Sequence, residues 1–350
     1  MKIAVLVSGG VDSSVALALL KQQGHDVTAF YLKIWLDDEL SFLNECPWSQ
    51  DLTFVQQVCT QLDVPLQIVS LQTAYRERVV AYTIEQVRSG KTPNPDVLCN
   101  QFIKFGLFLE TIDDSFDKVA SGHYAQVAKT ETGYQLMQAP DQIKDQTYFL
   151  SRLDQRQLSR CLFPIGHLNK GQVRELAHVF DLPNKDRKDS QGICFLGKFK
   201  FRDFVKHHLG QRQGDLIEYE TGAIIGKHEG FWFYTIGQRQ GLRLAGGPWY
   251  VVAKDSQRNA VFISRTYYEA DKQRKQVLVE QCHWLNGQVP DVNLLAVKLR
   301  HGPHIHHAQV IFNENKSCHL LLKENDQGLA AGQFAVFYQD NICLGSGIIA

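Results

Sequence analysis

A short glycine- and serine-rich loop constrains the fold of this chain more than any other segment. The loop SGGVDSS, residues 8–14, lies directly between an apolar run, IAVLV at 3–7, and a helical pattern that extends from residue 11 to about residue 23. A strand that passes through a glycine turn into a helix brings backbone N–H groups and the positive helix end to one point, where they bind phosphate. Gly9 and Gly10 allow this close approach, and three serine hydroxyls can donate to the same anion (Ser8, Ser13 and Ser14). The sequence therefore predicts a phosphate-binding loop after the first strand of an α/β domain.

The loop differs from the Walker A motif because it has no lysine. The chain contains one GKT sequence, at residues 90–92, but Glu85 stands where that motif needs its first glycine. A turn without chemistry would not explain a buried strand before the loop and an amphipathic helix after it. Asp12 in the loop is a candidate ligand for Mg²⁺, which prefers carboxylate and phosphate oxygens.

Strand and helix patterns alternate along the first 125 residues. The strand-like runs are 3–7, 27–35, 65–71 and 118–122, and the helical stretches lie at about 11–23, 51–62, 74–88 and 100–110. Such alternation predicts a doubly wound parallel sheet with helices on both faces. Ligands of such sheets bind beyond the carboxyl ends of the strands, where Ser8, Leu32 and Gly122 are expected.

The rest of the chain changes character twice. The stretch 150–181 has a helical pattern, with Asn169 as the expected N-cap of its second part. From residue 214 onward, short β-type runs follow one another at strand-and-turn spacing, and the charged stretch 270–276 is a candidate linker. We therefore expect three parts: an α/β domain at 1–200, a central β-rich module at 201–273 and a β-barrel at 274–350.

Charge is distributed unevenly along a chain whose net charge is zero. Residues 1–141 contain 10 basic and 17 acidic side chains, a net of −7, whereas residues 142–212 contain 14 and 7, a net of +7. Residues 213–350 balance at 13 and 13. A basic middle segment can bind the phosphates of a nucleic acid or can be an ordinary solvated surface, and charge alone does not decide between them.

Composition is typical of a soluble enzyme. Hydrophobic residues make up 44% and charged residues 21% of the chain, and no apolar run approaches the roughly 20 residues of a membrane helix. The first residues, MKIAVLVSGG, predict a buried strand rather than a signal peptide. The eight cysteines are scattered and form no CxxC pair, as expected in a reducing compartment. We therefore expect a cytoplasmic protein that does not contact membranes.

Cys99 lies in the segment TPNPDVLCN, after Pro93 and Pro95, which prevent a regular helix through that loop. The residues that follow can start a helix, so Cys99 is expected near the positive end of that helix, where the thiol pKa falls. Asp96 is close enough in sequence to exchange protons with a bound substrate. A small buried cysteine that caps a turn is the alternative.

Cys194 lies in the segment DSQGICFLG, between Gly192 and Gly197. These glycines predict a mobile loop, and cations upstream favour the thiolate (Lys185, Arg187 and Lys188). A small buried apolar residue is again the alternative. Among the other cysteines, Cys59 falls on the apolar face of a helix and Cys46 is undecided. Four more fall in packing patterns: Cys161, Cys282, Cys318 and Cys343.

A histidine-rich stretch, HGPHIHH at 301–307, resembles a metal-binding tract. Its histidines alternate with turn residues, and no carboxylate or cysteine is near in sequence. A surface strand or an RNA contact is therefore favoured over a metal site.

Together these motifs resemble those of the tRNA-specific 2-thiouridylases, a family of the PP-loop ATP pyrophosphatase superfamily. The resemblance covers nearly the whole chain and rests on SGGVDSS, TPNPDVLCN, SGHYA, KDQTYFLSRL, RKDSQGICFLG, FYTIGQRQGL, PWYVV and GQFAVFYQDNICLGSGII. Family members cleave ATP to AMP and pyrophosphate and place sulfur on carbon 2 of the wobble uridine in certain tRNAs. The resemblance implies ATP and Mg²⁺ as cofactors and the tRNAs for Lys, Glu and Gln as substrates. It also implies a persulfide donor as partner, either a cysteine desulfurase or a sulfur relay protein.

The resemblance also implies roles for individual residues. It makes Cys99 the nucleophile, Cys194 the persulfide carrier and Asp96 the acid or base, with a Cys99–Cys194 disulfide after turnover. The implied ATP-binding positions are Leu6, Val7, Ser8, Gly9, Gly10, Val11, Asp12, Ser13, Leu32 and Gly122. The implied tRNA-binding positions are Asn94, Pro95, Asp96, His123, Lys144, Asp145, Gln146, Arg300, His301 and Gln333. The pair Arg300–His301 departs most from the family pattern.

In the implied mechanism, ATP adenylates the uracil 2-oxygen and a Cys194 persulfide delivers sulfur to the activated carbon. Cys99 then attacks the carrier sulfur, either releasing sulfide or resolving the persulfide, and external thiol reduces the resulting disulfide. Two other interpretations stay open. A PP-loop amide or carboxylate ligase, related to NAD or GMP synthetases, would give Cys99 and Cys194 no role. A nucleotide-dependent RNA-binding protein without catalysis would release no AMP.

Overall fold

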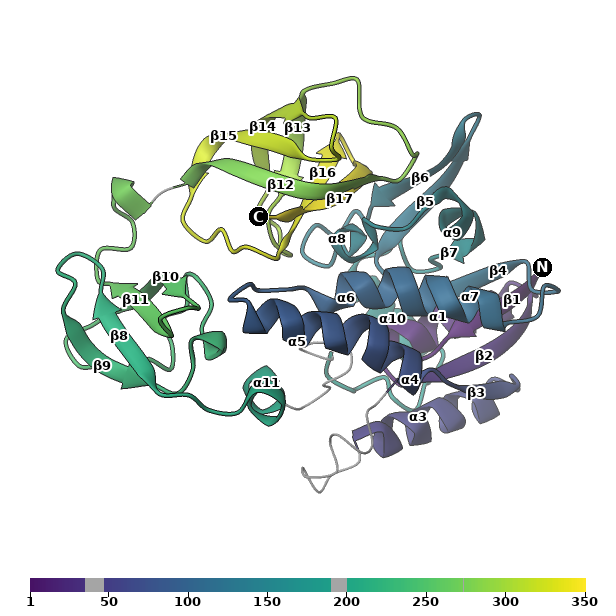
Figure 1. The fold of residues 1–350 in the computed structure, drawn as a ribbon. Coiled ribbons are helices and arrows are strands. Elements are labelled where there is room, and N and C mark those ends of the chain that lie inside the picture. The colour runs from purple at the N-terminus through teal and green to yellow at the C-terminus, as the bar shows by residue number, and fades with distance from the viewer. Residues whose placement is uncertain (35–46, 190–199, 273) are drawn as a thin grey trace.

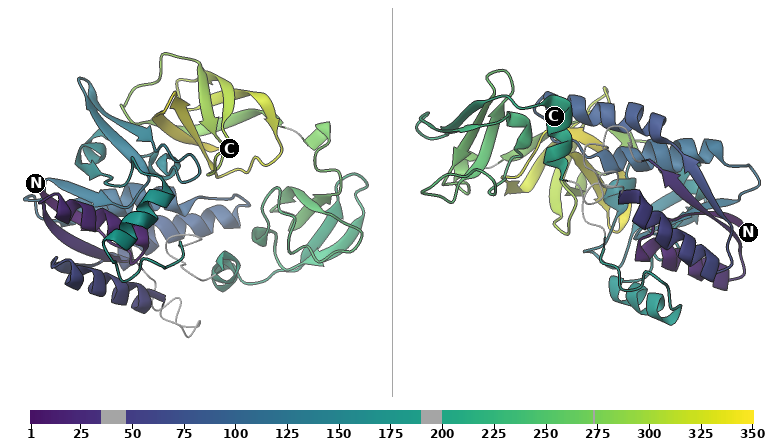
Figure 2. Two further views of the ribbon diagram at one scale, coloured as in Figure 1. Left: turned by 180° about the vertical axis from the view of Figure 1, so that it is seen from behind. Right: turned by 90° about the horizontal axis from the view of Figure 1, so that it is seen from below.

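The computed structural model describes residues 1–34, 47–189, 200–272 and 274–350. Within these ranges the chain forms an α/β domain, a small central β module and a β-barrel, which lie beside one another (Figures 1 and 2). Cys46 and Cys194 lie outside the described residues. The domain boundaries expected after residues 200 and 273 stay predictions.

The α/β domain is built on a parallel sheet, as predicted from the alternating pattern. Its strand order is β3-β2-β1-β4-β7, and every neighbouring pair is parallel. The strands are β1 (Lys2–Leu6), β2 (Asp26–Lys33), β3 (Leu66–Ser70), β4 (Lys118–Ser121) and β7 (Cys161–Leu162). Because Leu6 pairs with Phe30 on one side and with Ser121 on the other, β1 and β4 end level, whereas β2 continues to Lys33.

Helices cover both faces of this sheet, which follows from the alternation of side chains along β1. Ile3 and Val5 pack in one cluster with α1 (Val11–Gln22), α3 (Pro47–Gln61) and α10 (Lys170–Val179). Ala4 and Leu6 point to the other face and its helices. These are α4 (Gln72–Tyr75), α5 (Ala81–Arg88), α6 (Pro95–Leu98) and α7 (Phe108–Thr111), with π-helical stretches at Arg76–Val80 and Cys99–Leu107. The doubly wound arrangement is therefore confirmed.

The prediction of helix over residues 150–181 is only partly confirmed. The chain forms α8 (Thr147–Leu150) and α9 (Gln155–Arg160), but it then enters the short strand β7 before α10 begins. Pro164 follows β7 closely and is incompatible with a continuous helix. The expected N-cap is confirmed, since the Asn169 side chain accepts a hydrogen bond from the Gln172 backbone N–H (2.9 Å), and the Gln172 side chain accepts one from the Asn169 backbone N–H.

The central module begins with α11 (Phe201–Leu209) and contains a four-stranded sheet in the order β10-β11-β8-β9. Its strands are β8 (Gly214–Glu218), β9 (Ile224–His228), β10 (Tyr250–Asp255) and β11 (Ala260–Ser264). A small core that includes Trp249, Val251 and Ile263 holds it together. The module approaches the α/β domain at Gly90, where an added Cβ would lie 3.6 Å from the Phe231 ring.

The C-terminal part is a closed barrel, as predicted. Six strands follow the order β12-β15-β14-β13-β16-β17, and pairing of β12 with β17 closes the ring. They are β12 (Arg274–Trp284), β13 (Leu294–Lys298), β14 (His306–Phe312), β15 (Cys318–Asp326), β16 (Phe334–Gln339) and β17 (Ile342–Ile349). A hairpin of the α/β domain, β5 (Ala125–Thr130) and β6 (Gly133–Gln138), adds to this sheet through β17. Backbone hydrogen bonds thus join the first domain to the last.

A buried ion pair strengthens this junction. Lys298 at the end of β13 binds Asp145 with an Nζ–Oδ2 distance of 2.9 Å, and the two side chains are only 2% and 0% exposed. Asp145 also accepts hydrogen bonds from the Thr147 hydroxyl and the Ala139 backbone N–H. The charge of Lys298 is therefore compensated by a carboxylate that belongs to the α/β domain.

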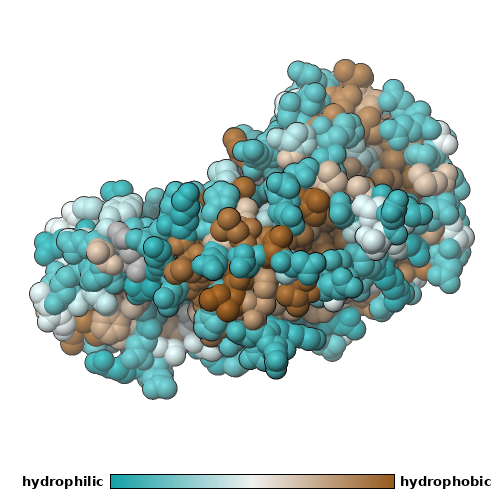
Figure 3. All heavy atoms as spheres, turned by 90° about the horizontal axis from the view of Figure 1, so that it is seen from above, coloured by the Kyte–Doolittle hydropathy of each residue, from teal (hydrophilic) through white to brown (hydrophobic). Residues whose placement is uncertain are grey.

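The face of the molecule seen from above is mostly polar (Figure 3). Figure 3 shows the molecule from above, where hydrophobic side chains form separate patches within a largely hydrophilic face. The exposed large apolar residues of the barrel include Leu278, Val289, Val292, Leu294, Ile311 and Leu321. No helix in the described part of the chain is long and apolar enough to cross a membrane.

The buried ion pair makes a prediction about stability. Lys298→Ala leaves the Asp145 carboxylate buried without its cation, which is expected to lower the free energy of unfolding by about 3–5 kcal/mol. Arg88→Ala is the matched control, because its pair with Glu85 is 59% and 62% exposed and is worth about 0–1 kcal/mol. Urea unfolding curves measure both. Equal losses in the two variants would contradict a stabilising role for the junction.

Candidate functional site

The phosphate loop lies where the parallel strands end. Ser8 lies two residues after the end of β1, Leu32 lies near the end of β2, and Gly122 follows β4. Val7 continues β1 with a backbone N–H donated to the Phe30 carbonyl (2.9 Å). The residues expected at the carboxyl edge of the sheet therefore meet there, as predicted from sequence.

The loop turns tightly into α1. Gly9 has φ 78°, a conformation that favours glycine, and Gly10 is the N-cap of the helix that starts at Val11. The hydroxyls of Ser13 and Ser14 donate to the Gly10 carbonyl at 3.1 and 3.0 Å. These bonds hold the first turn of α1 against the loop, so its N–H groups are oriented together.

Two residues that the sequence did not identify as part of the loop fix its backbone. Asn184 donates to the Gly9 carbonyl at 2.8 Å and to the Ser14 hydroxyl at 2.9 Å. Arg187 donates to the same carbonyl at 2.9 Å and also pairs with Asp51. From the sequence, Arg187 is only one of the cations upstream of Cys194. Nothing in the local sequence indicates its contact with Gly9, which lies 178 positions away.

A network of charges lies beside the loop. Lys170 binds Asp12 at 2.7 Å and Asp189 at 2.7 Å. Asp189 also pairs with Lys144 (2.7 Å) and Arg174 (2.5 Å). Burial would raise the pKa of Asp189, but hydrogen bonds from Lys144 and Lys170 outweigh it and hold that pKa well below its usual range. Lys170 is thus held next to the phosphate loop, and Lys144 is linked to it through Asp189.

Asp12 has one carboxylate oxygen that could bind a magnesium ion. Its Oδ1 accepts hydrogen bonds from Lys170 and from the Tyr124 hydroxyl (2.9 Å), which leaves Oδ2 as the oxygen for an ion. The described residues contain no group of three or more metal-binding side chains, at the loop or elsewhere. An ion at Asp12 would therefore take its other ligands from phosphates and water, as Mg²⁺ commonly does.

Gly122 packs against the start of α1. A Cβ at this position would lie 2.6 Å from the Ser13 backbone N and 2.7 Å from the Asp12 carbonyl carbon. No side chain fits between this turn and the phosphate loop, so the position requires glycine.

Cys99 does not lie at a helix end as predicted. The helix begins earlier, at Pro95, with Asn94 as its N-cap, and Cys99 opens the following π-helical stretch one turn inside. Its side chain is fully buried, and burial raises the pKa of the Cys99 thiol to about 11; the nearby Lys104 opposes this shift only in part. The prediction of a lowered pKa was therefore wrong, because burial outweighs any field of the helix.

The segment ahead of Cys99 contacts the barrel. Asn94 and Asp96 are half-buried, whereas Pro95 is buried. Gln333 on the barrel donates from Nε2 to the Thr92 carbonyl at 2.7 Å, and the Thr92 backbone N–H donates to the Ala331 carbonyl at 2.7 Å. Gln333 thus orients the segment that begins the helix of Cys99.

The turn Lys144–Gln146 also lies near the junction of the α/β domain and the barrel, but its three residues have different partners. Lys144 pairs with Asp189, and Gln146 accepts a hydrogen bond from the Tyr124 backbone N–H at 3.0 Å. Asp145 is buried in its pair with Lys298. The role of Asp145 as a tRNA contact, which the resemblance implies, stays a prediction.

His301 and Arg300 lie on the barrel side of the same junction. The His301 ring lies 4.5 Å from the Phe149 ring. Partial burial there lowers the pKa of His301, and the positive charge of Lys298 acts in the same direction. Arg300 pairs with Asp326. The fold thus brings His301 of the barrel against Phe149 of the α/β domain, which is far from it in sequence.

His123 lies deeper. Its Nδ1 is 2.7 Å from the Ser121 hydroxyl, and its ring contacts those of Phe105 and Phe163. Burial lowers the pKa of His123 well below its usual value, so the imidazole is neutral at pH 7. The other histidines of the 301–307 stretch form no metal cluster within the described residues; His306 instead pairs with Asp326 at 3.0 Å.

The close packing of Gly122 predicts a specific loss. Gly122→Ala should displace the phosphate loop and weaken binding of ATP, the ligand expected from sequence, by about tenfold or more, which is about 1.4 kcal/mol. Gly222→Ala in the turn after β8 is the control, since its φ of 72° strains an added side chain while no atom lies within 4 Å of the new Cβ. Equilibrium dialysis with labelled ATP measures both. Unchanged ATP affinity in Gly122→Ala would show that the loop is not the site.

The burial of Cys99 predicts low reactivity. With a pKa of about 11, its thiolate fraction should rise about tenfold per pH unit from neutral pH to pH 10. Iodoacetamide should therefore label Cys99 far more slowly in the folded protein than in urea, as followed by peptide mass spectrometry. Labelling near pH 7 at the rate of the unfolded chain would contradict the buried, protonated thiol.

Comparisons with known proteins find relatives that match the sequence of the whole chain. Family models match residues 1–198 (tRNA methyl transferase HUP domain), 202–265 (tRNA methyl transferase PRC-barrel domain) and 274–349 (aminomethyltransferase beta-barrel domain). The chain is 42% identical over 358 residues to the tRNA-specific 2-thiouridylase MnmA of Parabacteroides distasonis, covering 100% of this chain and 99% of that protein. It is also 42% identical over 359 residues to that of Porphyromonas gingivalis, with the same coverage. Among solved structures, NMN synthetase from Francisella tularensis matches with a TM-score of 0.34 and 16% identity, over 60% of this chain and 77% of that one.

The relatives extend over the whole chain, from the phosphate loop to the last strand of the barrel, and their identity with it is far above the level at which only a fold is shared. The resemblance found in the motifs is therefore confirmed, and the chain belongs to the tRNA-specific 2-thiouridylase family.

Proposed function

We propose that this protein is a tRNA-uridine 2-sulfurtransferase that consumes ATP and releases AMP and pyrophosphate. The observation that carries the proposal is the joining of a phosphate loop and a Cys99 segment in one domain of a chain that is 42% identical to 2-thiouridylases along its full length. ATP would activate the uracil oxygen, and the cysteines would supply and release sulfur.

ATP binding is supported by the geometry of the loop. Oriented N–H groups at the start of α1, with Lys170 held beside them and Lys144 linked to it through Asp189, suit a triphosphate. Leu32 and Gly122 flank this position on neighbouring strands. Bound Mg²⁺ at Asp12 would neutralise phosphate charge; the remaining stabilisation would come from the chain's own amides and lysines.

The proposed chemistry has three steps. The uracil 2-oxygen attacks the α-phosphorus of ATP, and pyrophosphate leaves. The terminal sulfur of a Cys194 persulfide attacks carbon 2, and the bond from that carbon to the adenylated oxygen breaks to release AMP. Cys99 then attacks the Cys194 sulfur, which breaks the S–S bond, leaves the delivered sulfur on the base and forms a Cys99–Cys194 disulfide. An external dithiol reduces this disulfide.

Asp96 is proposed as the acid or base, since it is half-buried near Cys99 and His301. Cys99 must leave its buried environment to attack, so a local rearrangement of the π-helical stretch is part of the proposal. A tRNA would lie along the junction of the α/β domain and the barrel, with Arg300 and His301 on its barrel side. A persulfide-carrying donor protein would load Cys194.

Methyl transfer, which the names of two matching domain models mention, suits the site less well. Methyl donors are already activated, so such a reaction would not need a loop that binds a triphosphate. The full-length relatives carry the name of a thiouridylase.

The cysteine scheme is tested by two variants. Cys99→Ser and Cys194→Ser are each expected to lower 2-thiouridine formation by on the order of 100-fold or more, because each removes a covalent step. AMP release with tRNA should persist, since adenylation does not use a thiol. The assay combines ATP, tRNA and a labelled persulfide donor with nucleoside mass spectrometry.

Cys59→Ala is the matched control for this test, because Cys59 is buried among the helices on the opposite face of the sheet. Full activity in either serine variant would rule out the two-thiol scheme. AMP accumulation by the wild-type protein without any 2-thiouridine would show that the acceptor atom is wrong.

A further inference from the structure

Strand β12 of the barrel contains an irregularity that turns a cysteine inward. Val277 and Val279 face the barrel interior, in the alternation normal for a strand. The pairing of β12 with β17 then shifts between Glu280 and His283, and Gln281 has φ 52°. This bulge breaks the alternation, so that Cys282 rather than Gln281 is buried.

A second cysteine, Cys318, lies on the neighbouring strand β15. Cys318 begins β15 opposite Val279, and its Sγ lies 3.7 Å from the Sγ of Cys282. Gly347 on β17 leaves the space for this pair, because a Cβ there would lie 3.0 Å from the Cys282 sulfur. The bulge, the glycine and the strand register therefore bring two free thiols into contact.

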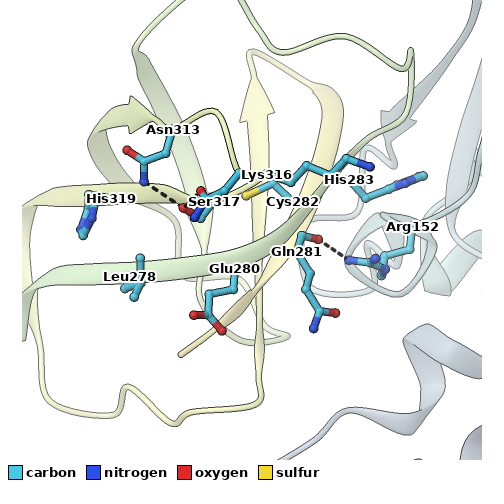
Figure 4. Close-up of a pocket in the computed structure, with 11 residues that line it drawn as sticks. Arg152, Leu278, Glu280, Gln281, Cys282, His283, Asn313, Lys316, Ser317 and His319 are labelled. Atoms are coloured by element: carbon cyan, nitrogen blue, oxygen red, sulfur yellow. Dashed lines mark hydrogen bonds between the residues drawn. The ribbon is translucent and has the colours of Figure 1, made fainter.

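The two thiols differ in access. A cavity of about 720 Å³ opens beside β12, and Cys282, Arg152 and Lys316 are among the residues that line it (Figure 4). Cys282 is 8% exposed, whereas Cys318 is fully buried behind it and does not line the cavity. A small molecule in the cavity would meet Cys282 first.

The surroundings also favour Cys282 as the reactive thiol. Hydrogen bonding with Cys318 lowers the pKa of Cys282, and the positive charge of Arg152 acts in the same direction, against burial. The same hydrogen bond and burial raise the pKa of Cys318. Arg152 is held in place by donating to the Gln281 carbonyl at 3.1 Å, as the dashed line in Figure 4 shows.

We propose that Cys282 and Cys318 form a second dithiol site, on a different module from Cys99, that reacts with a small hydroperoxide entering this cavity. The Cys282 thiolate attacks the peroxide oxygen, the O–O bond breaks, and Cys282 becomes a sulfenic acid as hydroxide or alcohol leaves. The Cys318 thiol then attacks the Cys282 sulfur, water leaves, and a disulfide forms. Both thiols together lose two electrons and two protons to the peroxide, and a dithiol restores them. This site is independent of the proposed sulfur transfer.

The test uses the full-length protein without tRNA or ATP. The protein is treated with hydrogen peroxide, its remaining thiols are alkylated in urea, and unreduced peptides are analysed by mass spectrometry. We expect a peptide pair cross-linked through Cys282 and Cys318 that disappears after reduction with dithiothreitol. In Cys318→Ser, dimedone should instead trap the sulfenic acid at Cys282.

Cys343→Ser is the matched control, since Cys343 is buried in the same part of the molecule and does not line the cavity. It should retain the Cys282–Cys318 cross-link, and Cys282→Ser should abolish it. The proposal is overturned if both thiols of the wild-type protein stay alkylatable at a peroxide concentration that oxidises free glutathione. It is equally overturned if Cys282 is linked only to another cysteine.

Discussion

The arrangement of the barrel on the α/β domain depends on the buried pair of Lys298 and Asp145. Each charge is shielded from water, so each is compensated mainly by the other, and loss of either leaves an isolated charge in the interior. Asp145 lies next to the turn that leads into α8, and Lys298 ends the strand that precedes His301. The position of the His301 ring on Phe149 therefore depends on an ion pair that joins the two domains.

Features that depend on neighbouring residues could be predicted from sequence. The strand, the glycine loop and the helix at the start of the chain are local, and so is the capping of α10 by Asn169. Contacts across the fold could not be predicted. Asn184 reaches the Gly9 carbonyl over 175 positions, and the β5–β6 hairpin joins a barrel that begins more than a hundred residues later. Nothing in the local pattern of either segment indicates its partner.

The error at Cys99 has a physical cause in the role of proline. Pro95 was interpreted as a residue that prevents helix, but at the first position of a helix its fixed φ and missing N–H are favourable. Asn94 supplies the cap by accepting from the Asp96 N–H, so the helix starts one turn before the cysteine. Cys99 then falls on the inner side of the helix, where packing with residues such as Ile103 excludes water.

Burial of Cys99 has a consequence for the order of events in the proposed reaction. A thiol with a pKa of about 11 is ionised in only about one molecule in 10⁴ at pH 7, so Cys99 is almost inert in this conformation. Activation of the uracil by ATP does not need it, whereas release of the delivered sulfur does. In the proposed reaction, Cys99 therefore acts only after its helix has rearranged. The same burial shields Cys99 from oxidants, while Cys282 in the barrel lines an open cavity. The structure thus separates a fully buried thiol near the proposed chemistry from one that lines a cavity away from it.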